Sequence, residues 1–146
     1  MKFLSSFIRR WMACFSRSEH SKSPKRPTKD QLGAEGEKHA EKFLKTHGYQ
    51  IIARNVQFSL GEMDLIAQVD KTIVFIEVKT RHSADYCHPR EVIDKKKRRK
   101  IKLMALQYYR NKKYAARGYI IRFDIITLVW PQGEQPKIEH FVDAFR

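Results

Sequence analysis

The sequence lacks the features of several large classes of protein. It has two cysteines, Cys14 and Cys87, which lie far apart and in no metal-ligand spacing, so neither a zinc site nor a disulfide framework is predicted. No apolar run approaches the roughly 20 residues needed to cross a bilayer. The start of the chain is a poor signal peptide, because Arg9 and Arg10 interrupt its apolar core and no small-residue cleavage site follows. We therefore expect an unsecreted protein in a reducing cytoplasm.

Acidic residues are also scarce, with 16 Asp and Glu against 30 Lys and Arg and a net charge of +14. The excess is unevenly distributed: residues 1–30 carry +6 and residues 90–117 carry +10, which leaves −2 for the rest of the chain. A strong positive charge predicts a polyanionic partner, either nucleic acid or an anionic membrane surface. A mildly acidic remainder predicts a carboxylate site flanked by surfaces that attract anions.

Three regions are predicted along the 146 residues. A chain of this length, 42% apolar, can bury the core of one ordinary domain, which we place at residues 31–146. Residues 17–30 are rich in Ser, Pro and basic residues without apolar periodicity, and this composition is typical of a flexible linker. Residues 1–16 form the third region.

Residues 1–16 have the pattern of a basic amphipathic helix. One half of the helical wheel is apolar, with Phe3, Leu4, Phe7, Ile8, Trp11, Met12, Cys14 and Phe15, and the other half carries the basic and serine residues. Such a helix binds a membrane surface or a groove of a partner protein. Docking on its own domain, or no stable structure, are the alternatives.

The apolar periodicity of the domain predicts an α/β fold, with a mixed central sheet flanked by two helices. Residues 72–79 include the nearly continuous apolar run IVFIEV, which is typical of a central strand covered on both faces. The predicted elements are a helix over 31–47, a strand over 49–54, a loop over 55–61, a strand hairpin of 62–69 and 72–79, a helix over 90–114, a strand over 119–130 and an edge strand over 138–145.

Two acidic residues are predicted to face one another across the hairpin. If the chain turns at Asp70-Lys71, residues whose numbers sum to 141 are opposed, which places Asp64 opposite Glu77. The same register places Glu62 opposite Lys79. Directly opposed side chains have Cβ atoms about 4.5–5.5 Å apart, and like charges at that distance are destabilising. The two carboxylates therefore need a cation.

Carboxylate ligands from Asp64 and Glu77 suit Mg²⁺ or Mn²⁺, ions that can also hold a substrate phosphate and activate a water. Lys79 shares the strand face of Glu77, where it could orient that water or neutralise charge developing on the phosphate. Glu37 falls about 20° from Leu44 on the helical wheel, at the edge of the buried stripe, so a helix packed on the sheet could aim it at the same site. Singly, each residue also fits an ordinary surface role; together they favour a site.

The second predicted helix begins with six consecutive basic residues, Lys95, Lys96, Lys97, Arg98, Arg99 and Lys100. Six helical positions sweep about 500°, so a merely solvated face would be interrupted by apolar residues every three or four positions. We therefore expect this end of the helix to project beyond the core, where it could bind phosphates. The alternative is a run of charge that only keeps the protein soluble.

Three short motifs resemble a known family. They are Gly33-x-x-x-Glu37, Gly61-Glu62-Met63-Asp64-Leu65-Ile66-Ala67 and Phe75-Ile76-Glu77-Val78-Lys79-x-Arg81. In this order and spacing they resemble the YraN family of uncharacterised bacterial proteins, over about residues 31–145. That family in turn resembles the restriction-endonuclease-like superfamily, and its archaeal Holliday-junction resolvases in particular.

The resemblance implies a restriction-endonuclease-like fold, with Asp64 and Glu77 as metal-binding acids, Lys79 as the lysine of the set and Glu37 as its helix acid. It implies Mg²⁺- or Mn²⁺-dependent hydrolysis of phosphodiester bonds in DNA or RNA, with branched DNA among the candidate substrates. A nucleic-acid-binding module of the same fold that does not cut is the first alternative. The second is an adaptor held at a membrane surface or on a partner by residues 1–16.

Overall fold

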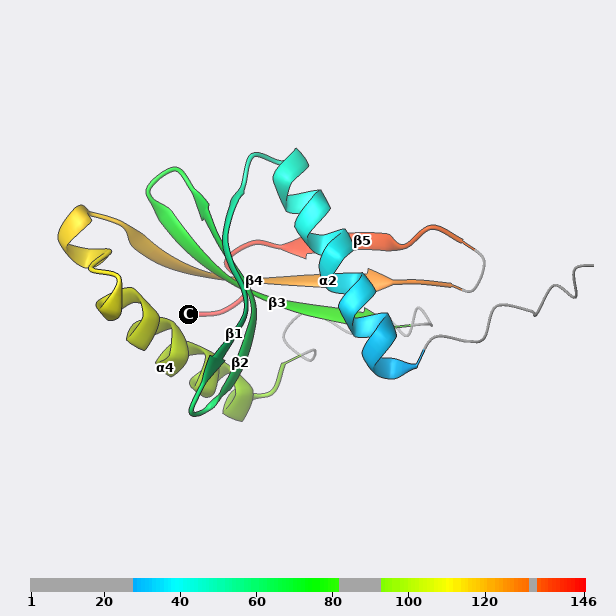
Figure 1. Cartoon of the computed structure of the whole chain (residues 1–146), viewed down its shortest axis with the longest axis horizontal. Coiled ribbons are helices and arrows are strands. Elements are labelled where there is room, and N and C mark those ends of the chain that lie inside the picture. Colours follow the sequence, from blue (N-terminus) through cyan, green and yellow to red (C-terminus); the bar gives the residue numbers. More distant parts are fainter. Residues whose placement is uncertain (1–27, 82–92, 132–133) are drawn as a thin grey trace, which may run out of the picture.

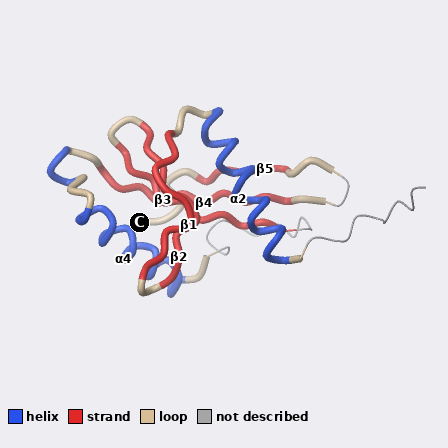
Figure 2. The backbone as a smooth tube through the Cα atoms, in the orientation of Figure 1, coloured by secondary structure: helices blue, strands red, loops and turns tan. Residues whose placement is uncertain are grey.

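A five-stranded sheet with a helix on each face makes up the part of the chain that the computed structural model describes, residues 28–81, 93–131 and 134–146 (Figures 1 and 2). The elements are α2 (Lys29–Thr46), β1 (Gln50–Phe58), β2 (Gly61–Val69), β3 (Thr72–Arg81), α4 (Lys95–Asn111), the 3₁₀ turn η1 (Ala115–Arg117), β4 (Ile120–Val129) and β5 (Lys137–Phe141).

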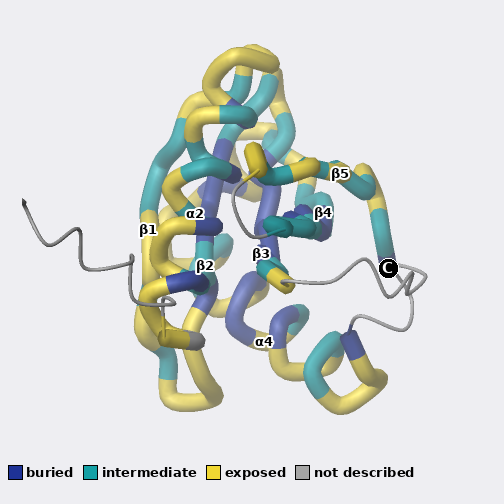
Figure 3. Tube along the Cα trace, turned by 90° about the vertical axis from the view of Figure 1, so that its right-hand side faces the viewer, coloured by how far each residue is buried: buried dark blue, intermediate teal, exposed yellow. Residues whose placement is uncertain are grey.

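The strands lie in chain order, β1-β2-β3-β4-β5, and neighbouring strands are antiparallel except for the parallel pair β3–β4. A parallel pair needs a crossover connection, and α4 lies within it. The predicted mixed sheet flanked by helices is therefore confirmed. The prediction that β3 is central is also confirmed, because residues 73–78 are all buried (Figure 3).

Each face of the sheet carries its own apolar core. On one face, α4 packs through Ile101, Met104 and Ala105 onto a group that includes Ile73 and Phe75. On the other face, α2 packs through Ala40 and Leu44 onto Leu65, Ala67, Val74, Ile76, Val78, Ile126 and Leu128. The alternation of β3 side chains between these two cores is why its sequence is apolar at nearly every position.

Helix α2 begins earlier than its apolar pattern indicated. Thr28 is its N-cap and forms a capping box with Gln31, in which the Thr28 hydroxyl accepts from Gln31 N at 3.3 Å and Thr28 N donates to Gln31 Oε1 at 3.0 Å. Lys29 and Asp30 are therefore helical, and the predicted linker ends too late. The rest of that linker, and the predicted amphipathic segment 1–16, lie outside the described residues.

Gly36 lets α2 approach β3 closely. A Cβ atom built on Gly36 would lie 1.8 Å from Thr80 Oγ1 and 3.0 Å from Thr80 Cβ, so no larger residue fits without a shift of helix or strand. The next residue along the helix is Glu37, which therefore starts from a backbone that lies close to β3.

Several predicted boundaries are wrong for identifiable reasons. Strand β1 continues to Phe58, because its pairing with β2 persists on both sides of Asn55, whose φ is 46°, and the expected loop shrinks to a tight turn. Helix α4 begins at Lys95, with Asp94 as its N-cap, and ends at Asn111, so Tyr114 lies beyond it. Residues 90–92 of the predicted helix are not among those described. Strand β5 ends at Phe141 and does not reach residue 145.

Candidate active site

The hairpin brings Asp64 and Glu77 to the same end of the β2–β3 ladder. The turn lies at Asp70 and Lys71, and the paired residues from Val69–Thr72 to Leu65–Ile76 sum to 141, so the predicted register is confirmed. The ladder ends there, and Asp64 Oδ2 accepts a hydrogen bond from Val78 N at 2.7 Å. The predicted pairs Asp64–Glu77 and Glu62–Lys79 both lie beyond the last pair of the ladder, so neither is part of it.

Glu62 instead belongs to the neighbouring pair of strands. It is aligned with Gln57 of β1, whose side-chain amide donates to Glu62 Oε2 at 2.5 Å. The prediction for Glu62 is wrong because the first residues of β2 pair with β1 but lie beyond the end of the β2–β3 ladder. Glu62 nevertheless remains near Asp64, since both line the same cleft.

Glu77 is the buried anion of the site. Only 2% of the residue is exposed, and its carboxylate Oε1 accepts from Lys79 Nζ at 2.6 Å and from the ammonium group of Lys97. Its second oxygen, Oε2, is buried and has no hydrogen-bond partner among the described residues. A buried carboxylate oxygen without a partner is costly, and so Glu77 retains the capacity to bind a further cation.

Asp64 is held in an environment that disfavours its charge. Burial, followed by the negative charge of Glu77, raises its pKa from 3.8 to about 6, although the hydrogen bond from Val78 N opposes the rise. The charge of Glu37 adds to the increase, and that of Lys79 reduces it. Two carboxylates that repel one another in a partly buried site form an arrangement that a divalent cation would relieve.

The raised pKa of Asp64 predicts how stability depends on pH in chelator-treated protein. Because folding favours protonated Asp64, the free energy of unfolding should fall as pH rises from about 4 to about 6, by up to about 3 kcal/mol, and level off above 6. Asp64→Asn should remove this step. Urea unfolding of both proteins between pH 4 and 7 measures it, and a difference between them that does not change with pH would contradict the assignment.

Lys79 lies on β3, beside the two acids Glu77 and Asp64. Burial alone would lower its pKa, but the charge and hydrogen bond of Glu77, together with a smaller effect of Asp64, raise it instead. Lys79 is thus a firmly protonated ammonium group with a third of its side chain exposed. Such a group can donate a hydrogen bond to an anion that approaches from the solvent side.

A cleft of about 540 Å³ opens beside these residues. Its lining joins four acids, from α2, β2 and the N-cap of α4, with lysines of α4 and a few apolar groups: Glu37, Glu62, Asp64, Asp94, Lys96, Lys97, Lys100, Leu60, Gly61 and Met104. Glu77 and Lys79 do not line it, and Glu77 connects to it through Lys97. The structure therefore brings Glu37 and Asp64 into one cleft, as the sequence predicted.

The donors available to a metal are the carboxylates of Asp64 and Glu77. Within the described ranges, no three His, Cys, Asp or Glu side chains are grouped closely enough to form a complete metal cage. Mg²⁺ commonly binds to one or two carboxylates and completes its shell with waters and substrate phosphate, so a two-carboxylate site fits Mg²⁺ or Mn²⁺ in an open site. The unpartnered Oε2 of Glu77 supports this fit.

The six basic residues of α4 do not all project into solvent as predicted. Lys97 turns inward to Glu77, and Arg98 Nε donates to the backbone oxygen of Ile93 at 2.9 Å. The other four are exposed, namely Lys95, Lys96, Arg99 and Lys100. The prediction is wrong for Lys97 and Arg98, because the first turns of α4 pack beside the sheet.

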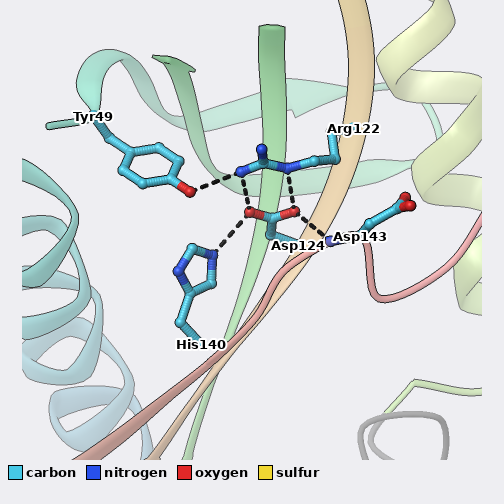
Figure 4. A network of polar contacts seen from close by, with 5 residues as sticks. All are labelled: Tyr49, Arg122, Asp124, His140 and Asp143. Atoms are coloured by element: carbon cyan, nitrogen blue, oxygen red, sulfur yellow. Dashed lines mark hydrogen bonds and ion pairs between the residues drawn. The ribbon is translucent and has the colours of Figure 1, made fainter. Parts of the chain in front are cut away.

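A second polar network was missed by the sequence analysis (Figure 4). The buried carboxylate of Asp124 on β4 accepts from Arg122 Nε at 2.9 Å and Nη2 at 2.8 Å, lies 2.8 Å from His140 Nε2, and accepts from Asp143 N at 3.0 Å. Arg122 also donates to the Tyr49 hydroxyl at 2.8 Å. The signal for it in the sequence was the presence of two charged residues, Arg122 and Asp124, in an otherwise apolar strand. The network joins β4 to β5 and to the start of β1.

Comparison with known proteins shows the family to which the sequence belongs. Residues 36–128 match the model of the uncharacterised protein family UPF0102, which is the YraN family. The chain belongs to this family. UPF0102 proteins of Rhodococcus opacus and Desulfosudis oleivorans are 41% and 40% identical to it over 115 and 117 residues, which cover 78% and 80% of this chain and 95% and 91% of theirs. A UPF0102 protein of Caldicellulosiruptor saccharolyticus is 43% identical over 100 residues, 68% of this chain and 83% of its own.

The resemblance to the YraN family predicted from the three motifs is therefore confirmed, and the match spans Glu37, Asp64, Glu77 and Lys79. The description of UPF0102 names no activity. Neither helix in the described ranges is long and apolar enough to cross a membrane.

Proposed function

We propose that this member of UPF0102 is a nuclease of restriction-endonuclease-like fold that depends on Mg²⁺ or Mn²⁺ and hydrolyses phosphodiester bonds in nucleic acid. The observation that carries the proposal is the pairing of Asp64 and Glu77, two mutually repelling carboxylates, with Lys79 beside them and lysines of α4 along the adjoining cleft. The two acids repel one another beside a carboxylate oxygen of Glu77 that has no hydrogen-bond partner among the described residues, and a bound cation would relieve both.

Each residue has a distinct part in this proposal. Asp64 and Glu77 hold the cation, which when bound would draw charge from the phosphate and make a water more acidic. Lys79 donates to a phosphate oxygen or orients the attacking water as negative charge develops. Glu37, on the cleft wall, accepts a proton from that water or acts as an outer ligand.

The lysines of α4 supply attraction for the nucleic acid. Lys96 and Lys100 line the cleft, while Lys95 and Arg99 extend the positive surface around the first turns of the helix. Contacts of this kind bind phosphates irrespective of base sequence and weaken as salt concentration rises. They position the backbone over the acids without selecting DNA or RNA.

One observation favours a nucleic-acid-binding module that does not cut. Glu77 is already neutralised by two ammonium groups, those of Lys79 and Lys97, and a carboxylate so paired can be maintained without a metal. The further alternative, an adaptor bound to a membrane surface or partner through residues 1–16, concerns a segment outside the described residues.

Metal-dependent cleavage tests the proposal directly. We expect hydrolysis of branched, single-stranded or duplex nucleic acid only with Mg²⁺ or Mn²⁺, and its loss in Asp64→Asn and Glu77→Gln. The metal should also stabilise the wild type, by about 2.7 kcal/mol at 100 times its Kd, and both substitutions should abolish that shift. Gel assays over the substrates, with thermal unfolding in chelator and in Mn²⁺, measure the two effects.

Glu35→Gln is a matched control, since Glu35 lies on the same helix as Glu37 but is half exposed and paired with Lys38. It should leave both cleavage and the metal-dependent shift unchanged. Salt-sensitive binding without cleavage of any substrate would instead establish the module that does not cut. No thermal shift at millimolar metal would contradict the metal site.

A further inference from the structure

Lys97 reaches across from α4 to the buried acid of the candidate site. Among the described residues, only Lys79 and Lys97 form ion pairs with Glu77, and both contact the same oxygen, Oε1. Lys79 belongs to the strand that carries Glu77, whereas Lys97 comes from a separate element. The cluster thus contains two carboxylates, Asp64 and Glu77, and two ammonium groups.

The ammonium groups of the two lysines differ in how readily they can move away from Glu77. The backbone of Lys97 is fixed, because its N–H donates to the N-cap Asp94 Oδ1 at 2.7 Å. Its side chain is 41% exposed and lines the cleft, so the ammonium group can exchange Glu77 for solvent without any change in the helix. Lys79 lies two residues from Glu77 on the same strand, and at 34% its side chain is the less exposed of the two.

A divalent cation at Glu77 would meet the ammonium group of Lys97 as a competitor. Both would be held by the same buried carboxylate, and two cations so close repel one another strongly in a partly desolvated site. Departure of Lys97 removes that repulsion. It also delivers the ammonium group to a cleft that already presents Lys96 and Lys100.

We infer that Lys97 is a removable counter-ion of Glu77: it occupies the carboxylate in the metal-free protein, competes with the divalent cation, and on displacement binds substrate phosphate in the cleft. The inference rests on the proposed function, whose metal site it presupposes. It implies that metal and nucleic acid strengthen each other's binding, since the phosphate offers Lys97 an alternative partner.

The test measures Mn²⁺ binding to the full chain at pH 8 by titration calorimetry, with no nucleic acid present. Lys97→Met should bind Mn²⁺ about tenfold more tightly than the wild type, which corresponds to about 1.4 kcal/mol, the size of one contact between an ammonium group and a carboxylate. Lys100→Met is the matched control. It removes the same charge from the same cleft but no ion pair with Glu77, so its affinity should change by no more than about twofold.

Two further variants keep the test decisive if Lys97→Met folds poorly. Lys97→Gln, which is neutral but can still donate to Glu77, should bind Mn²⁺ more tightly than the wild type. Lys97→Arg, which keeps the charge, should not. Equal or weaker Mn²⁺ binding by both neutral variants, beside a wild type that binds, would overturn the role of Lys97 and leave the proposed function intact. Failure of the wild type to bind Mn²⁺ would overturn both.

Discussion

Replacing Asp124 by alanine is expected to lower the free energy of unfolding by about 3–5 kcal/mol, the usual cost of removing one partner from a buried ion pair. Asp124 is 1% exposed and is contacted by Arg122, His140 and the backbone N–H of Asp143. Its removal leaves the Arg122 guanidinium with the Tyr49 hydroxyl as its remaining partner in the network of Figure 4. Urea unfolding at pH 7 measures the loss.

The side chain of Asp143 provides a matched control. It forms an ion pair with Arg146, whose side chain is 88% exposed, while only its backbone N–H enters the network. Asp143→Asn keeps that N–H and tolerates the positive φ of 52°, so the unfolding midpoint should change little. A loss in Asp124→Ala no greater than in Asp143→Asn would show that the network does not hold β5 to β4.

The Asp124 network is separate from the candidate active site. None of the five residues in Figure 4 is among those that line the cleft. We therefore regard the Asp124 network as structural, with the carboxylate acting as a common acceptor for Arg122 of β4, His140 of β5 and the backbone N–H of Asp143 in the turn after β5. The pKa of Asp124 agrees with this role: its hydrogen bonds from His140 and Arg122 outweigh burial and lower it below 3.8.

The hairpin was predictable because its signals are local. A short polar turn, an apolar run and the period of two along a strand indicated the register of the pairs from Val69–Thr72 to Leu65–Ile76, and Asp64 and Glu77 are the next residues beyond that ladder. The capping box at Thr28 and Gln31 is also a local signal, because its two residues are three apart, but the prediction missed it and began the helix at residue 31. The extension of β1 was not predictable, because Asn55 continues a strand with a backbone conformation usually found in turns.

Tertiary contacts explain what the sequence left open. A run of six basic residues contains no signal that Lys97 alone would turn toward a buried glutamate 20 residues earlier. Likewise, Arg122 and Asp124 are visible as charges in an apolar strand, but their partners Tyr49 and His140 lie far away in the chain. Pairings of this kind depend on how α4 packs on the sheet and on how β5 pairs with β4.

Lys79→Met is expected to reduce the rate of phosphodiester hydrolysis by about 10²- to 10³-fold, the range found when a donor aimed at developing charge is removed. The ammonium group lies 2.6 Å from Glu77 Oε1 and is partly exposed, so it can contact the reacting phosphate while staying beside the acid. In the ground state that phosphate also has the α4 lysines as partners. Binding of nucleic acid should therefore weaken by only a few-fold.

Single-turnover rates at saturating enzyme, set beside binding isotherms, separate these two effects. Lys100→Met provides the contrast, since Lys100 lines the cleft without an ion pair to Glu77: it should weaken binding and flatten its dependence on salt, yet leave the rate of the bound complex nearly unchanged. Mn²⁺ titration of Lys79→Met then checks that the reduced rate does not result from weaker metal binding. If Lys79→Met lost rate and binding in equal measure with its Mn²⁺ affinity intact, Lys79 would be a phosphate-binding residue alone, and the transition-state role would fall to a group that lines the cleft.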